Sequence, residues 1–116
     1  SYKLGDKDYQ DDKNQKSRNE ADLLKQAMES KYTRLLSENF LIGMNDIMDT
    51  ATMVGLQKNV YPLYDELKEL RGLNGVKDHL SYVASKREEY SKHNIARYLK
   101  KAIEQYLPTV KRQDLS

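Results

Sequence analysis

One arginine and one histidine near the C-terminal end could together act on a phosphodiester bond. Arg87 and His93 have five residues between them in a stretch of helical character. In that arrangement His93 would accept a proton from a ribose hydroxyl, and Arg87 would stabilise the charge that develops on phosphate. The two lie nearly two helical turns apart, and no third group orients the imidazole. We therefore predict no catalytic residues.

The residue types of this chain do not indicate a metal or cofactor site. The chain has no Cys and only two His, which excludes disulfides and thiolate metal sites. His79 follows Asp78 but has no acid at the three-residue spacing that di-metal helical bundles use. We expect no metal and no cofactor, and we expect His79 to be solvated or partly buried.

Basic residues gather toward the C-terminal end of the chain. Residues 85–116 carry eight Lys or Arg against four acids, although the formal net charge of the whole chain is only +2. A phosphate backbone could be followed by Lys92, Arg97, Lys100, Lys101, Lys111 and Arg112, with Tyr90 and Tyr98 nearby for base stacking. Because Glu88, Glu89 and Glu104 interrupt the series, we interpret it as a solvated helix face, and nucleic-acid binding stays an alternative.

Apolar residues recur at helical spacing through most of the chain. A helix is predicted from Ser17, whose capping box ends at Glu20, to Leu36, with a break or restart at residues 37–40. The stripe continues over residues 41–54, and Gly55 is expected to end that helix. Asn59 is the expected N-cap of a third helix, with Pro62 in its first turn.

The third helix is expected to stop at Arg71-Gly72-Leu73-Asn74-Gly75, the strongest turn signal in the chain. A fourth helical stretch is predicted from Val76 to Leu107, with a possible joint near Ser91, and Pro108 is expected to close it. No stretch shows strand-like alternation.

Short links between amphipathic helices favour antiparallel neighbours, so the sequence predicts an all-α, up-down-up-down four-helix bundle. We divide the chain into a polar N-terminal arm (1–16), the helical bundle (17–108) and a C-terminal tail (109–116). Nine Tyr accompany a single Phe and no Trp, and we expect the tyrosines and the four Met to fill a thin core.

The C-terminal helical stretches resemble those of a known family. Leu80-Ser81-Tyr82-Val83-Ala84 and the run from Ile95 to Pro108 (IARYLKKAIEQYLP) are similar to the last helices of PsbQ-like extrinsic subunits of photosystem II. Residues 56–70, with an aromatic residue before Pro62, are loosely similar to an earlier helix of that family. The resemblance implies a cofactor-free four-helix bundle in the thylakoid lumen, peripheral to the membrane, which supports the oxygen-evolving complex.

We therefore expect a non-enzymatic subunit that docks on a larger protein complex, with no transmembrane segment and with nucleic acid an unlikely partner. The expected contact residues are Tyr2, Leu4, Tyr9, Lys100, Lys101, Lys111 and Arg112. Two alternatives stay open: a basic helical nucleic-acid-binding protein, or a ribonuclease that resembles the HEPN type through Arg87 and His93.

Overall fold

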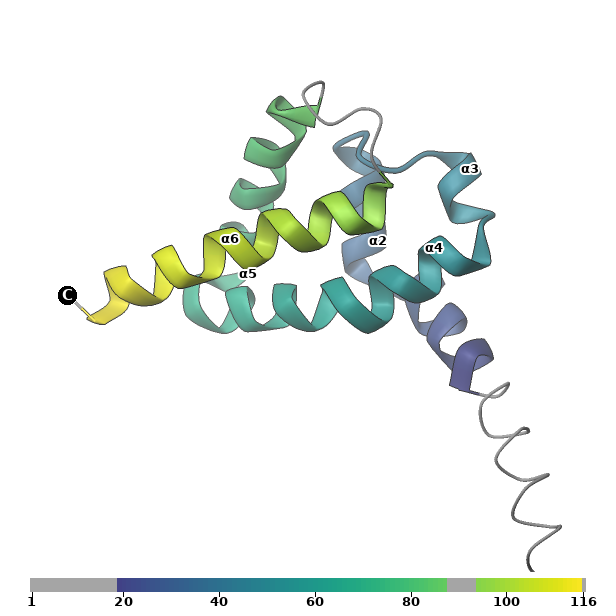
Figure 1. The fold of residues 1–116 in the computed structure, drawn as a ribbon, viewed down its shortest axis with the longest axis horizontal. Helices are drawn as coiled ribbons and strands as arrows, with labels where there is room; N and C mark the ends of the chain where they lie inside the picture. The colour runs from purple at the N-terminus through teal and green to yellow at the C-terminus, as the bar shows by residue number, and fades with distance from the viewer. Residues whose placement is uncertain (1–18, 88–93, 116) are drawn as a thin grey trace, which may run out of the picture.

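The computed structural model describes residues 19–87 and 94–115, and every regular element among them is helical (Figure 1). The helical residues 19–29 are followed by α2 (Lys31–Glu38), α3 (Met44–Ile47), α4 (Thr50–Gly55), the π-helical turn η1 (Leu56–Val60), α5 (Tyr61–Ser85) and α6 (Ile95–Leu115). The predicted all-α class is confirmed. The predicted arm at 1–16, the capping residue Ser17 and the joint near Ser91 lie outside the described residues.

The N-terminal helical region is more broken than its apolar pattern predicts. Ser30 leaves the helical conformation, and its side chain accepts a hydrogen bond from the backbone N–H of Tyr32 at 3.1 Å, which starts α2. The predicted break at residues 37–40 is confirmed, since α2 ends at Glu38 and Phe40 has a φ of 59°. Beyond it, the short helices α3 and α4 replace the single helix expected over residues 41–54.

A continuous helical rod runs from α4 through η1 into the first part of α5. Gly55 is the last residue of α4, as predicted, but the helical path continues directly into η1. The prediction that Asn59 caps the next helix is wrong, because Val60 holds the N-cap position of α5. Pro62 explains the π-helical turn, because a proline ring displaces the carbonyl four residues earlier, which is that of Lys58 in η1. The wider turn lets the backbone N–H of Tyr61 donate to the carbonyl of Leu56.

The predicted turn at residues 71–75 is confirmed as a sharp change of direction within α5. Gly72 has φ 75° and ψ 177°, a conformation that only glycine adopts without strain. A Cβ atom at Gly75 would lie 2.3 Å from the Cβ of Arg71, so the chain also needs its second glycine here. After Gly72 the remainder of α5 leads away from the rod (Figure 1).

The last helix, α6, packs on the rod in a parallel direction (Figure 1). A Cβ at Gly55, near the start of the rod, would lie 3.9 Å from the Cβ of Ala96, near the start of α6. At the other end Arg71 forms an ion pair with Asp114. The start of α6 therefore lies by the start of the rod and the end of α6 by its end, so the two run parallel. The predicted up-down-up-down order is not confirmed.

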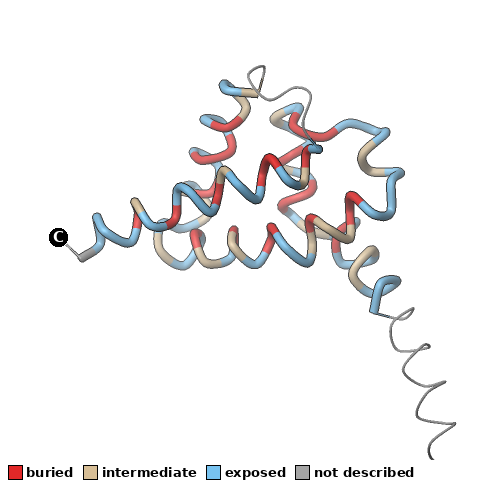
Figure 2. The backbone as a smooth tube through the Cα atoms, viewed as in Figure 1, coloured by how far each residue is buried: buried red, intermediate tan, exposed pale blue. Residues whose placement is uncertain are grey.

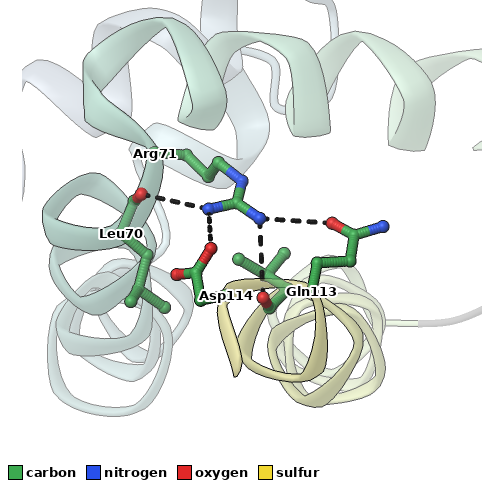
Figure 3. A network of polar contacts seen from close by, with 5 residues as sticks. Leu70, Arg71, Gln113 and Asp114 are labelled. Carbon is green, nitrogen blue, oxygen red and sulfur yellow. Dashed lines mark hydrogen bonds and ion pairs between the residues drawn. The ribbon is translucent and has the colours of Figure 1, made fainter. Parts of the chain in front are cut away.

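Arg71 holds the C-terminal turns of α6 to the bend of α5 (Figure 3). Besides its ion pair with Asp114, its guanidinium donates to the carbonyl of Val110 at 3.5 Å and to Oε1 of Gln113 at 3.2 Å. The prediction that Pro108 closes this helix is wrong, because α6 continues to Leu115. Pro108 is exposed on the outer side of the helix, while Val110 beyond it is fully buried, and that burial favours continuing the helix.

The buried residues form one core between α2, the rod, the second part of α5 and α6 (Figure 2). Tyr32, Tyr61, Tyr64 and Tyr98 are buried in it, which confirms the predicted role for these tyrosines, whereas Tyr82 and Tyr106 are exposed. The expectation for methionine is wrong for three of the four: Met53 is fully buried, but Met28, Met44 and Met48 are exposed.

Replacing Gly72 with alanine tests whether the bend depends on glycine. No neighbouring atom lies within 4 Å of a Cβ added there, so the expected loss comes from the backbone conformation alone. We expect Gly72→Ala to lower the free energy of unfolding by about 1–3 kcal/mol in urea denaturation. Gly43→Ala is the matched control, since Gly43 also has open space but a φ of −121°, and it should change stability by less than about 0.5 kcal/mol. Equal losses in both variants would mean that the bend does not depend on glycine.

Candidate functional site

Four of the predicted contact residues share the outward side of α6. Lys100, Lys101, Lys111 and Arg112 are all exposed there, and Arg97 lies on the same side. We call these five residues the basic face of α6. The remaining predicted contact residues, Tyr2, Leu4 and Tyr9, lie outside the described residues.

The basic face keeps most of its charge available to a partner. Among its members, Lys111 forms an ion pair with Glu66 of α5, and Arg112 donates to the Oγ1 of Thr109 at 3.3 Å. The acids of α6 are Glu104 and Asp114, and Asp114 is paired with Arg71. Five basic groups against two acids leave α6 with a formal charge of +3.

Tyr98, one of the two residues expected to stack on bases, does not lie on this face. Tyr98 is only 7% exposed, and its hydroxyl donates to the carbonyl of Val83 at 3.0 Å. Tyr98 therefore packs in the core and joins α6 to the second part of α5. Tyr90 and Lys92 lie outside the described residues.

Of the candidate ribonuclease pair Arg87 and His93, the structure describes only Arg87. The Nη1 of Arg87 donates to the carbonyl of Leu41 at 2.6 Å, so this guanidinium fixes the segment after α2. His93 lies outside the described residues, and their mutual geometry stays a hypothesis. In the part of the chain that the structure describes, no group of three His, Asp or Glu is placed to hold a metal ion.

A groove between the second part of α5 and α6 is the feature that sequence reasoning missed. Its cavity measures about 390 Å³. It is lined by His79, Tyr82 and Val83 of α5, by Lys86 directly after α5, and from α6 by Tyr98, Lys101, Ala102, Gln105, Tyr106 and Thr109. The signal was present in the sequence, because Lys101, Gln105 and Thr109 recur every four residues and so share one side of a helix. Only the bend at Gly72 brings the α5 residues opposite them.

His79 lies at the base of this groove and is buried, contrary to the expectation of a solvated or partly buried side chain. It is 4% exposed, and its ring stacks on Tyr106 with centroids 4.8 Å apart and planes at 16°. Neither ring nitrogen has a hydrogen-bond partner among the described residues. Burial lowers the pKa of His79 from 6.5 to about 4, so the imidazole is neutral at pH 7.

Stability should fall as the pH drops from 6.5 toward 4, because the unfolded chain takes up a proton at His79 in this range and the folded chain does not. The full shift corresponds to roughly 3–4 kcal/mol. We expect chemical denaturation at pH 7 and pH 4.5 to show a smaller loss for His79→Phe than for the unchanged chain. His93 and the carboxylates are common to both proteins, so the difference isolates His79. An identical pH dependence in the two would show that His79 titrates normally.

No helix among residues 19–87 and 94–115 is long and apolar enough to cross a membrane. Comparison with curated proteins and with solved structures found no match to this chain. Comparison with protein families found one that matches residues 1–115, described as the Lactococcus lactis RepB C-terminus.

This match overturns the resemblance to PsbQ-like subunits, and with it the expected docking on photosystem II and the location in the thylakoid lumen. The resemblance depended on tyrosine-rich amphipathic helices, a pattern that the parallel helices of this fold produce equally well. The view of nucleic acid as an unlikely partner has no support either. Because the match covers nearly the whole sequence, the chain belongs to the Lactococcus lactis RepB C-terminus family.

Proposed function

We propose that this chain is the C-terminal helical part of a plasmid replication protein and that it binds the DNA backbone through the basic face of α6. The family match is the observation that carries this proposal. A replication protein works on plasmid DNA in the bacterial cytoplasm, so a phosphate backbone is the acidic partner that its basic surface would meet. We assign no bond-making step to the chain.

The arrangement of charge supports the backbone as the target. The neighbouring helix α5 holds three basic residues against four acids, so the surplus positive charge belongs to α6 and not to the whole surface. Arg97, Lys100 and Lys101 lie within little more than one turn on one exposed helix side, so three cations are gathered where a phosphate backbone could contact them. No aromatic side chain of this face is needed for such contacts, which carry affinity without sequence specificity.

The double variant Arg97→Gln/Lys100→Gln tests the proposal, because both side chains are exposed and neither lines the groove. We expect weaker binding to duplexes of unrelated sequence by the same factor. The slope of log affinity against log salt between about 50 and 200 mM should fall by about 1.8, if each residue contacts one phosphate. Fluorescence anisotropy of a labelled duplex measures both quantities.

The matched control is Lys25→Gln/Arg34→Gln, which removes one Lys and one Arg from exposed positions outside α6. It should leave the salt slope unchanged. The proposal fails if the two double variants lose affinity equally, or if the unchanged chain binds no duplex at low salt.

A further inference from the structure

The groove between α5 and α6 has the size of a small-molecule site and a mixed lining. A cavity of about 390 Å³ lies within the usual range for ligand pockets of about 300–1,000 Å³. Aromatic rings come from both walls, with Tyr82 on α5 and Tyr106 on α6, and each wall adds one lysine, Lys86 and Lys101. A second, adjoining hollow is lined by Asp78 and shares His79, Tyr82 and Tyr106, so the groove extends past the histidine.

The ring of His79 lines the base of the groove, and its two nitrogens are closed to solvent. His79 is almost wholly buried, and both of its ring nitrogens lack partners among the described residues. A neutral imidazole carries one donor and one acceptor. Each nitrogen has less than 1 Å² of accessible surface, so a ligand in the groove contacts the imidazole ring without bonding to either nitrogen.

The rim of the groove supplies a stacking surface and positive charge. Tyr82 is 63% exposed, and the Nζ of Lys86 lies 5.9 Å from the centre of its ring. Neither Lys86 nor Lys101 forms an ion pair with another described residue. An exposed tyrosine ring accepts the flat face of a base, and the two lysines stand where an attached phosphate would need cations.

We propose that this groove binds a nucleotide, with its base stacked on Tyr82 and its phosphate near Lys86 and Lys101. This inference rests on the proposed function, in which the base belongs to an unpaired DNA strand. A free nucleotide has the same chemistry and is the other possible source. A base in a duplex is excluded, because stacked and paired bases present neither face nor polar edge to a groove.

Tyr82→Ala is the first test, because an exposed side chain can be removed with little effect on folding. We expect it to weaken binding to a labelled oligothymidylate of about 12 nucleotides by roughly 5- to 100-fold, and to leave duplex binding unchanged. Phe40→Ala, which removes an exposed aromatic ring 87% accessible and outside the groove, should change neither. Unchanged oligothymidylate binding in Tyr82→Ala would overturn the inference.

The second test separates the two sources and does not depend on a variant. Titration of the unchanged protein with deoxyadenosine monophosphate, with the oligothymidylate and with inorganic phosphate is followed by NMR of the His79 ring nitrogens. A shift with the oligonucleotide alone identifies unpaired DNA, and a shift with the mononucleotide as well identifies a nucleotide site open to free ligand. A shift with phosphate alone, or with none of the three, overturns the inference.

The two proposals fail in different ways. If Tyr82→Ala has no effect while Arg97→Gln/Lys100→Gln weakens duplex binding, the groove inference is wrong and the backbone proposal stands. If the chain binds no duplex but the mononucleotide shifts His79, the backbone proposal is wrong and the groove holds a free nucleotide.

Discussion

The parallel packing of α6 on the helical rod of residues 50–71 is the constraint on which the rest of the structure depends. Two parallel helices need a long return path between them, and the second part of α5 provides it after the bend at Gly72. That return path gives α6 a second neighbour, so one side of α6 is buried and the opposite side is left to Arg97, Lys100 and the other members of the basic face. Both the basic face and the groove are consequences of this one arrangement.

Aromatic rings link the elements that this arrangement brings together. Tyr32 of α2 lies 5.4 Å, between ring centroids, from both Tyr61 and Tyr64 of the rod, and Tyr64 lies 6.3 Å from His79 beyond the bend. His79 in turn stacks on Tyr106 of α6. A sequence with 33% charged residues has few aliphatic side chains to bury. Tyrosine side chains combine a large ring with a polar hydroxyl, and so allow a thin core to connect four elements. The hydrogen bond between Tyr32 and Asp65, at 2.6 Å, shows how a hydroxyl at the margin of this core is satisfied.

The sequence predicted the local features and failed on those that packing decides. Helical periodicity, the turn at Gly72 and the basic C-terminal end each depend on residues close together in the sequence. The structure contains all three. Pro62 lies in the first turn of α5, as predicted. Pro108 misled, because α6 continues past it to the buried Val110, whose packing favours the helix. The direction of α6 and the burial of His79 depend on residues far apart in the chain, which no spacing reveals. The family was also missed, because amphipathic helices rich in tyrosine are not specific to one fold.

A disulfide between the starts of the two parallel helices tests this arrangement most directly. The chain has no cysteine of its own, and the 3.9 Å between a Cβ at Gly55 and that of Ala96 matches the Cβ separation of about 3.8 Å in disulfides. We predict that Gly55→Cys/Ala96→Cys forms an intramolecular disulfide on mild oxidation, while Gly55→Cys/Asp114→Cys, at the other end of the same face of α6, stays reduced. A bridge in the second pair and none in the first would mean that α6 runs antiparallel to the rod, which would contradict the parallel packing.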